Sequence, residues 1–167
     1  LVKFIDRTFN IKREHFMPVW EYIVKNFTGL KTRFHFEIFP ELLDSDDLEF
    51  LKNVPHGLFQ FEMGIQSANP ETMKEINRSG SWERVEANIR SLVSMGNIHL
   101  HTDLIAGLPF EKYSDFSRSF NRVYSLGADH LQAGFLKILP GTEMFRRAGL
   151  YRMKYNDLPP YEVIENK

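Results

Sequence analysis

The segment TDLIAGLPFE, residues 102–111, ends an extended run on an acid and then breaks at a Gly-Leu-Pro turn. Upstream, the run HLHTDLI places His99, His101 and Asp103 on one face, because side chains of a strand alternate between its two faces. Downstream, residues 113–126 have a helical pattern. Polar side chains at the end of a strand, just before a turn into a helix, are typical of α/β binding sites. We therefore predict one wall of a ligand site at this position.

Length and composition indicate an ordinary globular domain. The chain has 167 residues, 43% of them hydrophobic and 26% charged, which is enough for a substantial core. Its net charge of −1 gives no electrostatic reason to expect nucleic acid or an anionic membrane as a partner. No apolar run approaches the roughly 20 residues of a membrane span. A cytoplasmic protein with a small-molecule substrate is the default expectation.

Cysteine is absent from the sequence. The chain therefore offers no disulfide, no thiolate metal site and no cysteine nucleophile. It also begins without methionine at Leu1, inside an apolar run, and ends in a polar stretch after Pro159 and Pro160. Native termini are usually polar and frayed. We expect a piece of a longer protein, with a main domain at residues 1–150 and a C-terminal extension or linker at residues 151–167.

Strand-like and helix-like segments alternate along the chain. Asn69 and Pro70 are typical of a helix start, and glycines follow two of the helical segments. Five βα units in series predict a parallel sheet with right-handed crossovers. The predicted strands are residues 1–6, 32–38, 58–65, 98–105 and 130–138. The predicted helical segments are residues 11–26, 40–50, a segment that begins at Pro70, and residues 82–95, 113–126 and 143–148. Asp44 or Ser45 is predicted to cap the helix in residues 40–50.

Three of the predicted strands have one polar face. A doubly wound sheet, buried on both faces, would have uniformly apolar strands. Alternating polar positions suit the inside of an open barrel that holds a polar ligand. A complete eightfold barrel needs roughly 250 residues. The sequence therefore predicts an α/β fold, a partial (β/α) barrel of about five βα units that resembles part of a TIM barrel. The polar positions are His35 and Glu37; Gln60, Glu62 and Gln66; and His99, His101 and Asp103.

Candidate binding residues follow the ends of these strands. If the strands are parallel and in order, their ends face one crevice at the C-terminal edge. Gln66 offers a donor and an acceptor, Asp103 accepts from hydroxyls, and Arg78 suits a carboxylate. Such a set would suit a ligand that carries both ribose and a carboxylate. The strand-end features are the run Asp6, Arg7 and Thr8; Glu37; the GIQS run of residues 64–67; and Asp103.

Four segments, taken in order, carry a family resemblance: GIQSANPETMKEINRS, TDLIAGLPFEKYSDF, LKILPGTEMFRRAG and PPYEVI. They resemble the radical S-adenosylmethionine superfamily, over residues 4–164. Within it they are most similar to the branch that often carries a cobalamin-binding domain. That branch includes proteins called anaerobic magnesium-protoporphyrin monomethyl ester oxidative cyclase, and the oxygen-independent coproporphyrinogen oxidases share its core. The resemblance implies a core fragment of an oxidoreductase or transferase, with a tetrapyrrole as one candidate substrate.

The resemblance also implies roles for individual residues around S-adenosylmethionine. Glu37 matches a strand-end acid near this cosubstrate, and Gln66 with Ser67 matches the GxQS-type turn beside it. Arg78 matches an arginine that approaches the methionine carboxylate. Asp103 matches the acid of the DLIxGLP motif, on the ribose side. Lys137 would present strand-end backbone to the adenine.

The family's CxxxCxxC loop, which holds a [4Fe–4S] cluster, has no counterpart here. We expect it upstream of Leu1, with the first barrel strand, so that only the full-length protein would hold the cluster. The cobalamin-binding domain would also lie upstream. The resemblance implies cleavage of S-adenosylmethionine by one electron, from a reductant such as flavodoxin or ferredoxin, and hydrogen abstraction by a 5′-deoxyadenosyl radical. The fragment alone should be inactive.

Two other classes of function remain open from the residues alone. His99 and His101, with Asp103 or Glu37, match the spacing of a metal-dependent barrel hydrolase, for which tightly bound zinc would be the test. A catalytically silent binding or scaffold domain is the second. An open barrel would also leave an unpaired edge at residues 1–6, where two copies of the fragment are expected to pair.

Overall fold

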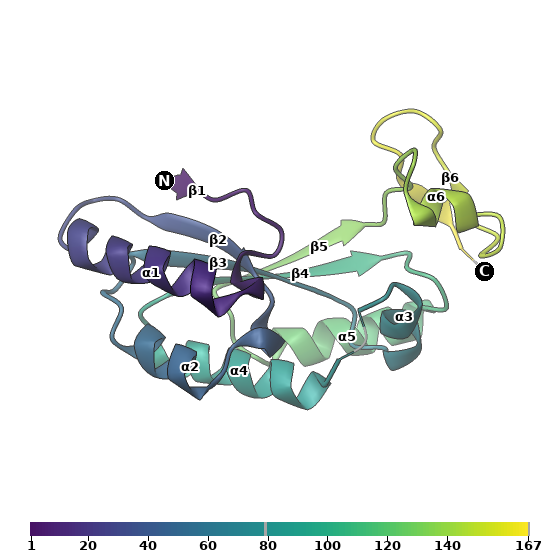
Figure 1. Cartoon of the computed structure of the whole chain (residues 1–167). Helices are drawn as coiled ribbons and strands as arrows, with labels where there is room; N and C mark the ends of the chain where they lie inside the picture. The colour runs from purple at the N-terminus through teal and green to yellow at the C-terminus, as the bar shows by residue number, and fades with distance from the viewer. Residues whose placement is uncertain (79, 167) are drawn as a thin grey trace. The chain divides into compact units, whose positions relative to one another are not determined.

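The computed structural model describes residues 1–78 and 80–166. Its main sheet has five strands in the order β1-β2-β3-β4-β5, so that the order in space is the order in the chain. Helices follow the strands, and the predicted α/β fold with a partial (β/α) barrel of parallel strands is confirmed (Figure 1). The strands of this sheet are β1 (Val2–Lys3), β2 (Phe34–Ile38), β3 (Phe59–Gln66), β4 (His99–Ala106) and β5 (His130–Phe135), and the helices between them are α1 (Arg13–Phe27), α2 (Ser45–Lys52), α3 (Pro70–Glu75), α4 (Trp82–Met95) and α5 (Tyr113–Tyr124).

The contacts of the backbone divide the chain into two compact units. Strands β3, β4 and β5 each begin in the first unit and end in the second. The first unit consists of Leu1–Ile65, Gly80–Asp103 and Val123–Leu131, and the second unit of Gln66–Ser79, Leu104–Arg122 and Gln132–Lys167.

The core of the first unit is aromatic. Trp20 of α1 is fully buried, and its ring centroid lies 5.5 Å from that of Phe61 and 6.0 Å from those of Phe36 and Phe59. Helices α1, α2 and α4 lie on the same side of β2 and β3 (Figure 1). Buried aromatic side chains contribute large apolar areas, so this cluster accounts for much of the stability of the unit.

Polar contacts between helix ends and loops hold the helical layer in place. Asp44 starts α2 with a capping box: its Oδ1 accepts from the Asp47 backbone N at 2.8 Å, and Asp47 Oδ2 accepts from the Asp44 backbone N at 3.2 Å. The cap predicted at Asp44 or Ser45 therefore lies at Asp44. Buried Asn88 of α4 donates to the carbonyl oxygens of Pro40 and Leu43 at 2.8 and 3.0 Å.

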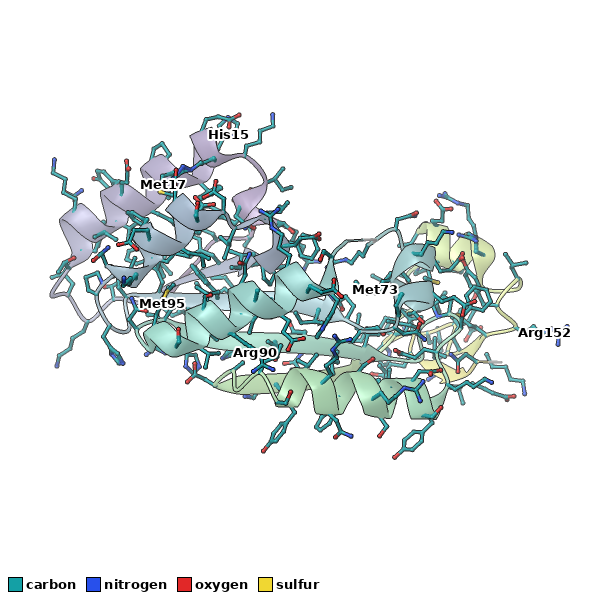
Figure 2. All side chains as sticks on the ribbon, turned by 90° about the horizontal axis from the view of Figure 1, so that it is seen from below. His15, Met17, Met73, Arg90, Met95 and Arg152 are labelled. Atoms are coloured by element: carbon teal, nitrogen blue, oxygen red, sulfur yellow. The ribbon has the colours of Figure 1, made fainter. Side chains whose placement is uncertain are left out.

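The outer surface of α4 is polar. Figure 2 shows the helical side of the protein and labels Arg90 on α4. Its guanidinium bonds the carboxylate of Glu86, one turn earlier, at 2.9 Å. Such pairs contribute only about 0.3–0.5 kcal/mol on a helix surface, so the buried side of α4 matters more for the fold.

Two strands, β1 and β5, end earlier than the sequence pattern predicts. β1 covers Val2–Lys3 of the expected residues 1–6, because the chain turns into a short 3₁₀ helix (Phe9–Ile11) before α1. β5 ends at Phe135, whereas residues up to 138 were expected. Beyond it, Leu136 accepts from the backbone N of Val163 at 2.9 Å, and Lys137 forms an antiparallel bridge with Glu162. The C-terminal segment thus pairs with residues 136 and 137, which the apolar pattern assigned to the strand.

The second unit has its own apolar cluster and a short antiparallel sheet. β6 (Lys154–Tyr155) pairs with β7 (Val163–Glu165), after the short helix α6 (Glu143–Arg147). The Tyr151 hydroxyl donates to Glu75 Oε1 at 2.6 Å, and burial together with this acid raises the pKa of Tyr151 to about 12. In the described ranges no helix is both long and apolar enough to cross a membrane. The buried members of the cluster are Leu108, Leu136, Ile138, Ala148, Tyr151 and Met153.

Candidate functional site

One face of the strands in the first unit is apolar and the other is polar, as the alternation predicts. On β3, Phe59, Phe61 and Met63 are fully buried, whereas Gln60 and Glu62 are only half-buried. β4 continues the pattern up to Asp103. Because β2 and β3 are parallel and Glu37 is the register partner of Glu62, their side chains stand side by side on the polar face.

Glu62 is the best-paired acid on this polar face. Its Oε2 lies 2.9 Å from His35 Nε2 and accepts from Lys3 Nζ at 3.2 Å. Burial alone would raise the pKa of Glu62, but Lys3 and His35 outweigh it, and the pKa is lowered. Glu62 is therefore ionised at neutral pH, and its charge acts on its neighbours.

Asp103 is the acid with the most perturbed environment on the same face. Burial, followed by the charges of Glu62 and Glu37, raises its pKa to about 6. No hydrogen bond to a described residue compensates. Glu37 has a weak partner, since Arg7 Nε lies 3.7 Å from its Oε2 and is largely exposed. Three carboxylates near one another, with no ion pair at Asp103 among the described residues, form a site that favours a positively charged ligand.

The histidines of the polar face contact one another. His101 Nε2 lies 3.0 Å from His99 Nε2 and 3.4 Å from the amide nitrogen of Gln60. His99 Nδ1 lies 3.5 Å from Asp129 Oδ2. Burial lowers the pKa of His101, and His99 and His130 lower it further, so this imidazole is neutral at neutral pH. Among residues 1–78 and 80–166, no three histidine or carboxylate side chains are arranged to hold a metal ion.

Gln66 ends β3 in an unusual backbone conformation. Its φ is 69°, in the left-handed region that non-glycine residues rarely adopt. Its side-chain Oε1 is buried and has no hydrogen-bond partner within the described part of the chain. A buried carbonyl oxygen without a donor is costly, so this atom is an acceptor that a ligand donor would satisfy.

Ser67, the next residue, is buried within the second unit. It is 1% exposed, and its hydroxyl donates to Glu111 Oε1 at 2.5 Å. Glu111 lies in the segment TDLIAGLPFE, but no sequence pattern singled it out as a site residue. The only sequence signal for Glu111 was an acid immediately after an apolar turn. Its partner, Ser67, lies 44 positions earlier in the chain.

The two remaining predicted residues lie in the second unit. Arg78 follows α3, and its backbone N donates to the Met73 carbonyl at 2.8 Å. Lys137 lies beyond β5, in the antiparallel bridge with Glu162, and its side chain is exposed. The structure thus brings Glu37 and Asp103 together with Glu62 in the first unit, and places Gln66, Ser67, Arg78 and Lys137 in the second.

Comparison with known proteins gives one family match. The model of the Radical SAM superfamily matches residues 2–123. Among curated proteins, the chain is 32% identical over 91 residues to a heme chaperone HemW of Mycobacterium tuberculosis, covering 54% of this chain and 23% of that protein. It is 29% identical over 140 residues to the oxygen-independent coproporphyrinogen III oxidase of Salmonella typhimurium, covering 79% and 29%. The chain thus spans less than a third of the length of these relatives.

Solved structures agree on the fold. The coproporphyrinogen III oxidase HemN from Escherichia coli superposes with a TM-score of 0.64 at 24% identity, over 78% of this chain and 30% of that one. The methyltransferase TsrM from Kitasatospora setae, solved with cobalamin and a [4Fe-4S] cluster, superposes with a TM-score of 0.72 at 17% identity, over 94% and 31%. At these identities the similarity establishes the architecture alone.

Proposed function

The chain belongs to the Radical SAM superfamily, and we propose from this membership that its polar strand ends bind S-adenosylmethionine within a longer enzyme. The observation that carries the proposal is the group of three carboxylates, Glu37, Glu62 and Asp103, in which burial, followed by the charges of Glu62 and Glu37, raises the pKa of Asp103 to about 6. When bound, this cosubstrate supplies the radical chemistry after which the superfamily is named.

Residues of each unit, taken by themselves, fit chemical groups of the cosubstrate. S-adenosylmethionine carries a sulfonium cation and an ammonium group, and the three carboxylates offer negative charge to both. The unsatisfied Oε1 of Gln66 offers an acceptor to an amino or hydroxyl group. Arg78 would bind the carboxylate, and backbone near Lys137 would receive the adenine. Orientation of the ligand and exclusion of water would be the contribution of these residues.

The chain does not fit an iron–sulfur cluster. It has no cysteine, and Fe–S clusters are held by cysteine thiolates. We propose that the ligands of a [4Fe–4S] cluster lie outside residues 1–167 and that the cluster receives its electron from a protein such as flavodoxin or ferredoxin. Cobalamin use, through a further domain, is consistent with the cobalamin in the TsrM structure.

A tetrapyrrole is the substrate class that we propose for the longer enzyme. Two of the relatives carry heme or coproporphyrinogen in their names. A magnesium-protoporphyrin monomethyl ester, the substrate of oxidative cyclases in the branch that the motifs resemble, is the specific candidate. A tRNA-2-methylthio-N(6)-dimethylallyladenosine synthase of Clostridium botulinum is 28% identical over 122 residues. It represents a competing class of substrate, tRNA.

The test compares two ligands that differ by one charge. S-adenosylmethionine has a positively charged sulfur, whereas the sulfur of S-adenosylhomocysteine is neutral. Isothermal titration of the 167-residue chain should give roughly tenfold tighter binding of S-adenosylmethionine at about pH 7.5. The ratio should fall towards about pH 5, because Asp103 becomes protonated below about pH 6.

Variants test the part that Gln66 plays in binding. Gln66→Ala should weaken binding roughly tenfold, the value of one buried hydrogen bond. Asn121→Ala is the control, because Asn121 is exposed on helix α5 and should leave the affinity unchanged. A well-folded chain that binds neither ligand would contradict the proposal and favour a silent scaffold domain. Equal affinity for the two ligands at both pH values would rule out the role of the carboxylates.

A further inference from the structure

Three buried polar side chains from separate segments of the second unit form one hydrogen-bonded cluster. Ser67, in the turn after β3, is 1% exposed, Glu111 before α5 is 7% exposed, and Ser119 of α5 is 2% exposed. The Ser67 hydroxyl donates to Glu111 Oε1 at 2.5 Å and accepts from the backbone N of Asn69 at 2.9 Å. Ser119 Oγ lies 3.4 Å from Ser67 Oγ and accepts from the backbone N of Ala68 at 3.0 Å.

This cluster restrains the turn that follows Gln66 through hydrogen bonds. Ser67 and its two successors, Ala68 and Asn69, are each held by at least one of these bonds. Gln66 stands immediately before them with a φ of 69°, a conformation that costs free energy for a residue with a side chain. Such a conformation persists only where the surrounding structure holds it. The cluster supplies that restraint on one side of Gln66, and the pairing of β3 supplies it on the other.

We propose that Glu111 is a positioning residue, which holds Ser67 and thereby aims the side-chain amide of Gln66 at the ligand. This inference rests on the proposed function, since it assigns the ligand-facing role to Gln66. Glu111 itself does not contact the ligand in this arrangement. It acts through the Ser67 hydroxyl, which would otherwise be free to rotate and release the turn.

The two oxygens of Glu111 have different roles. Oε1 accepts from Ser67, whereas Oε2 is buried without a hydrogen-bond partner among residues 1–78 and 80–166. Burial raises the pKa of Glu111, the Ser67 hydroxyl opposes the rise, and the nearby charge of Asp115 adds to it. Only one oxygen is therefore needed for positioning. An amide in place of the carboxyl keeps that acceptor, which makes glutamine the conservative replacement.

The experiment compares Glu111→Gln, Glu111→Met and Ser67→Ala by titration with S-adenosylmethionine. Glu111→Met and Ser67→Ala should each weaken binding roughly tenfold, and the double variant should bind no worse than either single one, because both changes break the same bond. Glu111→Gln should bind within about twofold of the wild type. Glu14→Met is the control, since Glu14 is exposed on α1.

Amide hydrogen exchange gives a readout that needs no ligand. Exchange at Ala68 and Asn69 should become roughly tenfold faster in Glu111→Met and Ser67→Ala and stay unchanged in Glu111→Gln and Glu14→Met. A merely structural role would lower the stability of Glu111→Met while its folded form binds as the wild type does, and that result would overturn the proposal.

The two readouts separate this inference from the proposed function. If the wild-type chain does not bind S-adenosylmethionine, the proposed function fails, and faster exchange in both variants still supports the restraint of the turn by Glu111. Unchanged exchange in a folded variant overturns the restraint whatever the ligand does. If Glu111→Met does not fold, exchange at Ala68 in Ser67→Ala decides the outcome, because the acceptor of the Ala68 N–H is Ser119 Oγ and is retained in that variant.

Discussion

Replacing Asp103 by asparagine should stabilise the protein at neutral pH. The pKa of Asp103 rises from its ordinary value of 3.8 to about 6 in the folded state, first because of burial and then because of Glu62 and Glu37. The native state thus binds more protons than the unfolded state between roughly pH 4 and 6, and stability falls as the pH rises through this window. Above about pH 6 the destabilisation is complete, and Asp103→Asn removes it.

The size of the effect follows from the same numbers. A rise from 3.8 to about 6 is about two pKa units, and each unit corresponds to about 1.4 kcal/mol, which sets an upper limit of about 3 kcal/mol. Asp103 is only half-buried, so solvent screens part of this repulsion. We expect Asp103→Asn to gain about 1–2 kcal/mol relative to the wild type between about pH 4.5 and about pH 7.5.

Urea unfolding followed by tryptophan fluorescence measures this difference directly. Both tryptophans, Trp20 and Trp82, lie in the first unit together with Asp103, so the signal reports on the unit that changes. Asp157→Asn is the control, because Asp157 is exposed, and its effect should stay within about 0.5 kcal/mol at every pH. A stability difference between Asp103→Asn and the wild type that does not vary with pH would refute the reasoning.

Three further changes test the core, a helix start and the edge of the sheet. Phe36→Ala should cost about 3–5 kcal/mol in urea unfolding, because Phe36 is fully buried, whereas Ala in place of the exposed Phe135 should cost less than about 1 kcal/mol. Asp44→Ala removes half of the capping box and should lower the free energy of unfolding by about 0.5–2 kcal/mol. At the edge strand β1, we propose that two copies of the chain pair; sedimentation should detect a dimer that Val2→Lys abolishes, and a wild-type monomer at high concentration would contradict it.

Local patterns were sufficient for the elements and for the polar face. The alternation of apolar and polar residues on β3 and β4 depends only on side chains two positions apart, and the structure has the same alternation. The cap of α2 could also be predicted to within one residue, as Asp44 or Ser45, since capping involves residues three positions apart. The ends of β1 and β5 could not be predicted, because the length of a strand depends on the segments that it pairs with. β5 ends where the C-terminal segment begins to pair with the chain.

The amino-acid sequence by itself determined the kind of fold, the polar side of the strands and the presence of acids at their ends. Only the tertiary structure decided how these acids behave. Glu37, Glu62 and Asp103 come from three strands, and the raised pKa of Asp103 exists because folding buries it beside the other two. The bond from Ser67 to Glu111 joins residues 44 positions apart. Charge interactions and buried hydrogen bonds depend on distance in space, and distance along the chain does not predict it.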